Sequence, residues 1–211
     1  DATSITDAIY DAGYPAPGRF YAESDALLGM TPKAFRGGGR GETIRFAVAQ
    51  GSLGAVLVAA TTRGVCAVLL GDDAEALVED LQARFAEANL EGADPSFDAT
   101  VAIVVGLVDH PGDAPELPLD LRGTAFQRRV WRALTQIPAG ETRTYTEIAA
   151  AIGSPRSSRA VAGACAANPV AVIVPCHRVV RADGGLSGYR WGIDRKRTLL
   201  QREARDVLRL F

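Results

Sequence analysis

The pattern of apolar and polar positions predicts a small sheet near the middle of the chain. Three short, valine-rich apolar segments are separated by turns that contain glycine, which is typical of an antiparallel meander. The segments cover residues 44–49, 53–61 and 65–70. Two candidate helices follow at 74–88 and 98–108, before a connection rich in proline and acidic residues.

From residue 122 onward the pattern becomes mostly helical. The apolar positions of a first helix fall on one stripe, and the helix stops at Pro138-Ala139-Gly140; the stripe consists of Phe126, Val130, Leu134 and Ile137. Thr144 and Glu147 predict a capping box for a second helix over 145–152, which the following glycine ends.

A third helix is expected to open at Ser154-Pro155 and to run to about residue 167. With the preceding helix and its tight glycine turn, it indicates a helix-turn-helix. Arg156 and Arg159 share a face in this prediction, with small residues below Arg159, namely Ala162, Gly163 and Ala166. Such a face lets another backbone approach while an arginine projects, but ordinary helix packing also uses small residues, so both interpretations stay open.

The first 43 residues are expected to form two short helices, at about 4–13 and 16–28, and a glycine-rich linker over 37–41. The chain does not begin with methionine, and motif-like sequence starts almost at once. We therefore expect it to be a fragment of a longer protein.

Charge divides the chain more sharply than its net value of −2 suggests. Residues 1–121 carry 7 basic and 19 acidic side chains, whereas residues 122–211 carry 16 basic and 6 acidic ones, a net charge of +10. Such a basic stretch is typical of a segment that binds a polyanion, although a solvated face beside an acidic neighbour would have the same composition.

Composition also indicates the compartment. The three cysteines form no Cys-x-x-Cys motif and no signal peptide precedes them, which predicts a reducing, cytoplasmic environment. No segment reaches the roughly 20 apolar residues that a membrane span needs, so a soluble protein is expected.

Cys176 differs from the other two cysteines. Cys66 and Cys165 lie in apolar sequence, where a cysteine usually serves as a small packing residue. Cys176 lies within Pro175-Cys176-His177-Arg178, and Arg181 follows. Because positive charge lowers the pKa of a thiol, this setting predicts a reactive cysteine.

The position of His177 next to Cys176 needs explanation. Residues 170–174 are apolar and strand-like, and adjacent side chains of a strand point to opposite sides. His177 would therefore reach the thiol only through a water molecule or a bend. A Cys-His hydrolase would need a separate, well-placed histidine, and only His110, in the acidic connection, is available.

Residues 122–211 contain a series of distinct motifs. They are Gly123-Thr124-Ala125-Phe126-Gln127, Ile137-Pro138-Ala139-Gly140, Tyr145, Ser158-Arg159-Ala160-Val161, Ala167-Asn168-Pro169, residues 173–180 and Ser187-Gly188-Tyr189-Arg190-Trp191-Gly192. Together they closely resemble the catalytic domain of the O6-alkylguanine-DNA alkyltransferases, and the signature around the cysteine is highly specific.

The rest of the chain resembles two further units. Residues 44–121 resemble that family's small amino-terminal domain, through Arg63-Gly64-Val65-Cys66 and residues 69–73. Residues 4–36 resemble the second helix-turn-helix of AraC-type regulators, through Ala12-Gly13-Tyr14 and residues 29–32. This order is similar to that of bacterial adaptive-response regulators.

The resemblance predicts an α/β (α+β) fold in three parts. Residues 1–43 would be a partial AraC-type helix-turn-helix and linker. Residues 44–121 would form a small RNase H-like antiparallel sheet domain. Residues 122–211 would form a mostly helical catalytic and DNA-binding domain that contains a helix-turn-helix.

The resemblance also implies single-use chemistry. Cys176 would attack the alkyl carbon on O6 of guanine and keep it as a thioether, which water does not cleave. His177 would deprotonate the thiol through a water molecule, and Glu203 would orient His177. Tyr145 would hydrogen-bond the leaving purine or press the phosphate. No metal or organic cofactor is implied.

Substrate contacts follow from the same resemblance. An alkylated base must leave the duplex before attack, and Arg159 would fill the vacated stack. Further DNA contacts are implied for Tyr145, Asn168 and Arg156, and the pocket would be formed by Tyr189, Trp191, Asn168, Val174 and Pro175. Trp191 stands where some relatives carry a small residue, so we expect methyl groups to be accepted and benzyl-type groups to be rejected.

The implied partner is double-stranded DNA that carries alkylated bases. The chain is expected to be monomeric and not to bind a membrane. It is expected in the cytoplasm, at the bacterial nucleoid, as part of a methylation-responsive transcriptional regulator. Whether O4-alkylthymine is also repaired is left open. The alternative is a catalytically silent regulator that binds alkylated DNA and in which Cys176 only packs, but relatives of that kind lack the cysteine.

Overall fold

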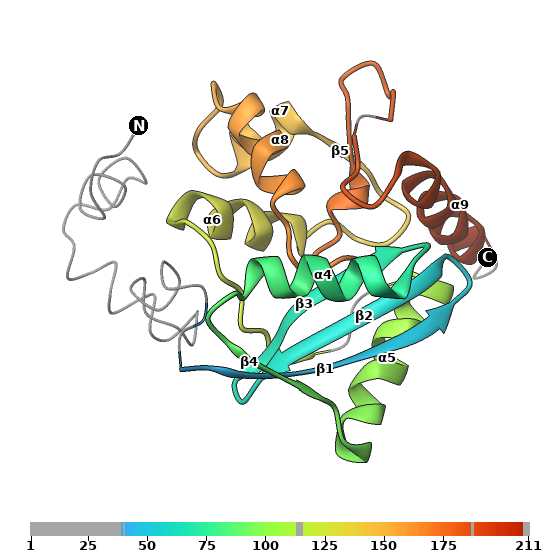
Figure 1. Ribbon diagram of the computed structural model, residues 1–211. Helices are drawn as coiled ribbons and strands as arrows, with labels where there is room; N and C mark the ends of the chain where they lie inside the picture. Colours follow the sequence, from blue (N-terminus) through green and yellow to red (C-terminus); the bar gives the residue numbers. More distant parts are fainter. Residues whose placement is uncertain (1–38, 40, 113–115, 187, 209–211) are drawn as a thin grey trace.

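The computed structural model describes residues 39, 41–112, 116–186 and 188–208, and of residues 206–208 only the backbone (Figure 1). The predicted helices and helix-turn-helix of residues 1–36 lie outside the described residues. The described part combines a four-stranded sheet with helices, as the fold class predicted.

The three predicted strands form the expected antiparallel meander. They are β1 (Thr43–Gly51), β2 (Gly54–Thr61) and β3 (Gly64–Gly71). A fourth strand, β4 (Asn89–Gly92), was not predicted and pairs with β1 in parallel, so the sheet is mixed rather than wholly antiparallel. Its four residues lack the alternation that marks a strand, and its pairing comes from distant residues of β1.

Two helices cover the two faces of the sheet (Figure 1). Helix α4 (Ala74–Arg84) packs on one face, where Leu57 and Leu69 join its Leu77 and Leu81 in one core cluster. The short helix η1 (Pro95–Phe97) leads into α5 (Asp98–Asp109), which packs on the other face. Helix α4 ends four residues earlier than predicted, because Phe85 leaves helical geometry and packs into the core.

The second half contains four α-helices among the described residues. They are α6 (Ala125–Leu134), α7 (Tyr145–Ala151), α8 (Ser158–Ala166) and α9 (Ile193–Leu208), with short parallel strands β5 (Arg143–Thr144) and β6 (Val179–Val180) between them. The capping box of Thr144 and Glu147 is present, as predicted. No described helix combines the length and apolar character needed to cross a membrane.

Two local predictions for this half were wrong. Helix α8 begins at Ser158, and the residues before it form a turn in which Ser157 N–H donates to Ser154 O, so Arg156 does not share a helix face with Arg159. Residues 170–174 are not a strand: Val170 makes a single bridge to Val68, and the chain then turns through Val172 at a φ of +59°.

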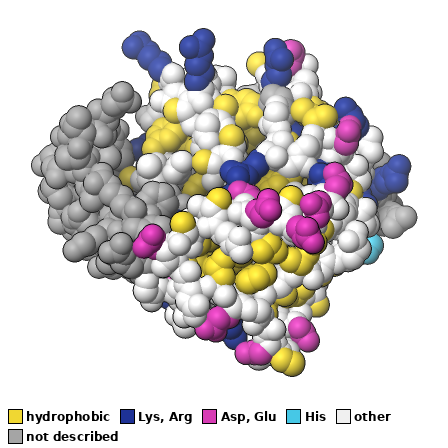
Figure 2. All heavy atoms as spheres, in the orientation of Figure 1, with side chains coloured by type: hydrophobic (Ala, Val, Ile, Leu, Met, Phe, Trp, Pro, Cys, Tyr) yellow, Lys and Arg dark blue, Asp and Glu magenta, His cyan; other side chains and the backbone are white. Residues whose placement is uncertain are grey.

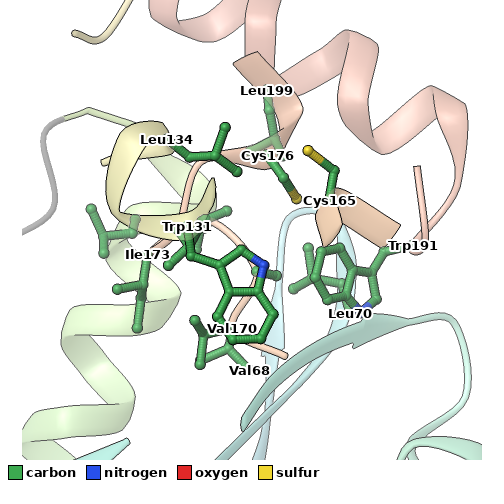
Figure 3. Packing of buried hydrophobic residues seen from close by; sticks show 14 of the residues in the cluster. Val68, Leu70, Trp131, Leu134, Cys165, Val170, Ile173, Cys176, Trp191 and Leu199 are labelled. Carbon is green, nitrogen blue, oxygen red and sulfur yellow. The ribbon is translucent and has the colours of Figure 1, made fainter. Parts of the chain in front are cut away.

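The two halves share one hydrophobic cluster. It joins Val56, Val68 and Leu70 of the sheet to Trp131 of α6 and Leu199 of α9 (Figure 3). Trp131 is 1% exposed, and its indole N–H donates to Ala164 O at 2.8 Å. Burial of large apolar side chains from both residues 44–121 and residues 122–211 stabilises a fixed arrangement of these two parts.

Candidate active site

Cys176 lies at the start of a buried 3₁₀ turn, η2 (Cys176–Arg178), between the segment after α8 and strand β6. Its Sγ accepts a hydrogen bond from Asn168 Nδ2 at 3.2 Å, and the same amide group donates to Val174 O at 2.8 Å. The fully buried Asn168 also accepts from Val170 N–H, so one side chain holds the end of α8 against the cysteine segment.

The thiol does not have the lowered pKa that the neighbouring arginines led us to expect. Burial raises the pKa of Cys176 from 9.0 to about 11, against smaller opposing effects of the Asn168 hydrogen bond and the charge of Lys196. Arg178 pairs with Glu203 instead, and the exposed Arg181 pairs with Asp183. The thiol is therefore protonated near pH 7, and a nucleophilic role for Cys176 would need a base.

His177, the predicted base, follows Cys176 in the same turn. It is 1% exposed, and its Nε2 lies 2.9 Å from Glu203 Oε1, while its Nδ1 is buried without a hydrogen-bond partner. Burial lowers the pKa of His177, so the ring is neutral near pH 7 and can take up a proton. Because residues 176–178 form a turn rather than a strand, the argument from strand alternation does not apply.

Glu203, on α9, is held as a carboxylate. Burial acts to raise its pKa, but hydrogen bonds from His177 and Arg178 outweigh burial, and the pKa lies below its ordinary value. Arg178 Nε and Nη2 lie 3.0 and 2.9 Å from Oε1, and Gly140 N–H donates to Oε2 at 3.2 Å. Arg178 thus balances the buried negative charge, which leaves His177 free to stay neutral.

Sequence reasoning missed Lys196, which is fully buried on α9. Its Nζ donates to Val179 O, and burial lowers its pKa while the charges of Cys176 and Cys165 act to raise it. The only available signal was the single lysine among fifteen arginines in residues 122–211. A buried cation near Cys176 favours the thiolate.

Tyr189 and Trp191 lie together after the cysteine segment. Their rings meet edge to face, with centroids 5.1 Å apart. Trp191 is 5% exposed and its Nε1 is buried without a partner; the Tyr189 hydroxyl is also buried and unpartnered, and burial raises the pKa of Tyr189. Val174 and Pro175 are buried beside Cys176, and their place in a substrate pocket stays a prediction.

Two of the predicted DNA-contacting residues, Tyr145 and Arg159, lie on one side of α7 and α8. An open hollow of about 420 Å³ is lined by Tyr145, Thr146, Ser158, Arg159, Ala162, Arg181, Ala182 and Asp183. Gly163 and Ala166 are exposed on α8. Basic side chains project from this end of the molecule (Figure 2). Arg156 is exposed in the turn before α8 and does not line the hollow.

The other histidine lies apart from the site. His110 is exposed at the end of α5, so it does not complete a Cys-His pair. Within the described residues, no three His, Cys, Asp or Glu side chains are grouped so that they could hold a metal ion.

A family profile described as "6-O-methylguanine DNA methyltransferase, DNA binding domain" matches residues 125–205. The Mycobacterium tuberculosis OGT, solved in complex with DNA, is 36% identical in sequence and superposes with a TM-score of 0.63, covering 77% of this chain and 93% of that one. The chain belongs to the 6-O-methylguanine DNA methyltransferase family.

Curated members of this methyltransferase family include longer proteins. The bifunctional transcriptional activator and DNA repair enzyme Ada of Escherichia coli is 51% identical over 203 residues, which is 96% of this chain and 57% of Ada. The methylated-DNA–protein-cysteine methyltransferase of Mycolicibacterium paratuberculosis is 60% identical over 90 residues, or 43% of this chain and 54% of the relative. The chain thus spans little more than half of these relatives, and its similarity to Ada confirms the predicted relation to an adaptive-response regulator.

Proposed function

We propose that this chain removes an alkyl group from O6 of guanine in double-stranded DNA and keeps it on Cys176 Sγ. The observation that carries the proposal is the His177–Glu203 pair beside Cys176, with His177 Nδ1 buried and unpartnered. That nitrogen can accept the thiol proton through one bridging water, which matches the need for a base created by the raised pKa of Cys176.

In the proposed reaction His177 takes the thiol proton through the water, and Glu203 balances the charge that develops on the ring. The sulfur forms a bond to the alkyl carbon as the bond from that carbon to O6 breaks, and the electron pair of that bond stays on the guanine. The guanine takes up the proton held by His177, through water, and leaves as its neutral keto form. Tyr145 contacts the leaving purine or the phosphate. Because the product is a thioether with no route to hydrolysis, each molecule reacts once.

Access to the base requires flipping. The extruded guanine would enter from the side of α7 and α8, Arg159 would occupy the space it leaves, and Tyr189 would contact the flipped ring. The face of small residues on α8 supports a close approach to the minor groove. Nothing within 4 Å would meet a Cβ at Gly163, so packing within this chain does not require a glycine there.

Mapping the transferred group tests the proposal. Protein incubated with duplex DNA carrying O6-methylguanine should gain one methyl group on the tryptic peptide 160–178. Because this peptide contains both Cys165 and Cys176, fragmentation must place the group on Cys176. The Cys165→Ala variant should still react and Cys176→Ala should not; a methyl group on Cys165, or no adduct at all, would refute the proposal.

The similarity to Ada supports a second, broader part of the proposal, that this chain belongs to a regulator that responds to DNA methylation. This part would be tested in the longer protein, by asking whether transcription of a reporter responds to methylating agents.

A further inference from the structure

The turn that carries Tyr189 and Trp191 is held against the sheet by hydrogen bonds of Arg195, which follows the turn in the chain. Gly192 N–H donates to Tyr189 O at 3.0 Å, and Gly192 has a φ of +96°, which closes the turn. Arg195 Nη1 then donates to Trp191 O at 3.0 Å, while its Nε donates to Leu53 O at 2.8 Å. Its Nη2 also pairs with Asp72, so a single guanidinium ties the turn to two points of the sheet domain.

The middle of the same turn is fastened by Arg190. Its Nη2 lies 3.3 and 3.4 Å from the two carboxylate oxygens of Asp80, on α4. Asp80 also accepts hydrogen bonds from Arg84 Nε and Nη2, at 3.2 and 3.1 Å. The carboxylate of Asp80 thus contacts both Arg84 of its own helix and Arg190 of residues 122–211. Acidic side chains gather over α4 in Figure 2.

An open hollow of about 520 Å³ lies between α4 and this turn. Its walls include Leu70, Leu77 and Asp80 on the sheet side and Arg190 and Trp191 on the other. The buried indole N–H of Trp191 has no partner, so no hydrogen bond of its own fixes the ring. The position of the indole therefore depends on packing and on the backbone of the turn.

We propose that Asp80 is a positioning residue that limits the size of the alkyl group that the protein accepts. By holding Arg190, it keeps the turn against α4, with the Trp191 indole packed beside Tyr189. When the pair is broken, the turn moves away from α4 more often, and the indole can then move into the hollow, which widens the space near Cys176. This inference rests on the proposed alkyl transfer.

The expected effect is modest. Both side chains of the pair are about one-third exposed, at 34% for Arg190 and 36% for Asp80. Water screens such a pair, so it biases a conformation by a factor of about two to five. The hydrogen bonds of Arg195 are untouched, and the turn should stay in place most of the time.

The test uses a ratio that misfolding or weak DNA binding does not change. Transfer rates are measured from O6-butylguanine and O6-methylguanine in the same duplex, and the butyl-to-methyl ratio is compared between variants. Asp80→Asn should raise the ratio about two- to fivefold. Arg84→Gln is the matched control, because it removes the other guanidinium on Asp80 without touching the turn, and it should leave the ratio unchanged. The charge swap Asp80→Arg with Arg190→Asp should restore the wild-type ratio.

Acrylamide quenching of tryptophan fluorescence gives an independent readout. The chain has two tryptophans, and Trp131 is 1% exposed, so increased quenching in Asp80→Asn would report on Trp191. The proposal is overturned if Asp80→Asn matches Arg84→Gln in both ratio and quenching. If wild-type protein transfers no methyl group, the proposed function fails, while quenching still decides whether Asp80 positions the turn.

Discussion

The proposed role of Cys176 has to be reconciled with the burial of its thiol. Its thiol is buried and its pKa is raised to about 11, which keeps the thiol protonated in the resting protein. Reactivity would then come from His177 when a substrate is in place, and the Asn168 hydrogen bond and nearby Lys196 would stabilise the thiolate once it forms.

The state of His177 predicts how stability depends on pH. Burial lowers its pKa in the folded protein below the ordinary value of 6.5. As the pH falls below about 6.5, the unfolded chain takes up a proton that folded His177 does not, so the free energy of unfolding should decrease. Urea unfolding between pH 5 and pH 8 would measure this. His177→Gln should flatten the dependence in this range, and an equally steep dependence in the variant would contradict the assignment.

Trp191 predicts the range of alkyl groups. Its 5% exposed indole packs against Tyr189 in the predicted pocket, so free O6-benzylguanine should inactivate the wild-type protein very slowly. Trp191→Ala should accelerate inactivation at least tenfold, while costing about 3–5 kcal/mol of stability. Rapid inactivation of the wild type would show that the indole does not limit the pocket.

For single residues, the sequence predicted a reactive Cys176 but not the direction in which the pKa of its thiol is shifted. The flanking arginines suggested a lowered pKa, whereas folding directs Arg178 to Glu203, which is 25 residues away in sequence. Lys196 gave almost no signal, because a lysine in an amphipathic helix is usually exposed. The role of Glu203 came only from family resemblance, since no local pattern connects it to His177.

At the scale of elements, helix α8 combines a projecting arginine with an exposed face of small residues. Local signals predicted this helix and the capped α7 before it, because caps and glycine turns act within a few residues. The start of α8 was misplaced by the turn at residues 154–157, and β4 and the turn through Val172 were missed, because contacts with distant strands decide them.

Gly163 offers a test that separates folding from DNA binding. No atom lies within 4 Å of a Cβ placed there, so Gly163→Leu should fold and should gain about 0.5–1 kcal/mol from helix propensity. The added side chain would hold a duplex away from α8 and should reduce methyl transfer at least tenfold. Ala102→Leu, on the exposed side of α5, is the control for an added leucine. Normal transfer by Gly163→Leu would place the DNA elsewhere.

Across the whole molecule, residues 44–121 and residues 122–211 are joined by a shared hydrophobic cluster and by polar contacts. Arginines of residues 122–211 contact the earlier part of the chain, as Arg202 does when its Nη1 donates to Ser52 Oγ and Val108 O, each at 2.8 Å. The division at residues 43 and 121 stays a prediction, since the hydrophobic cluster crosses the second boundary.

The division of charge along the chain predicts where DNA binds. If residues 122–211, at a net charge of +10, supply the phosphate contacts, affinity should fall steeply with salt. Deleting residues 1–38 should leave the slope of log affinity against log salt unchanged, because strand β1 begins only at Thr43. Fluorescence anisotropy with a labelled duplex would measure the slope, and a large loss of slope would assign the contacts to the amino-terminal segment.

The most direct test of the central claim is a count of transferred methyl groups. Protein is titrated with an excess of duplex DNA containing labelled O6-methylguanine, and the label bound to protein is followed to completion. We predict a plateau at one methyl group per molecule, with repaired guanine formed in equal amount and no label on Cys176→Ala. Repaired guanine in excess of protein, or repair without bound label, would contradict transfer to Cys176.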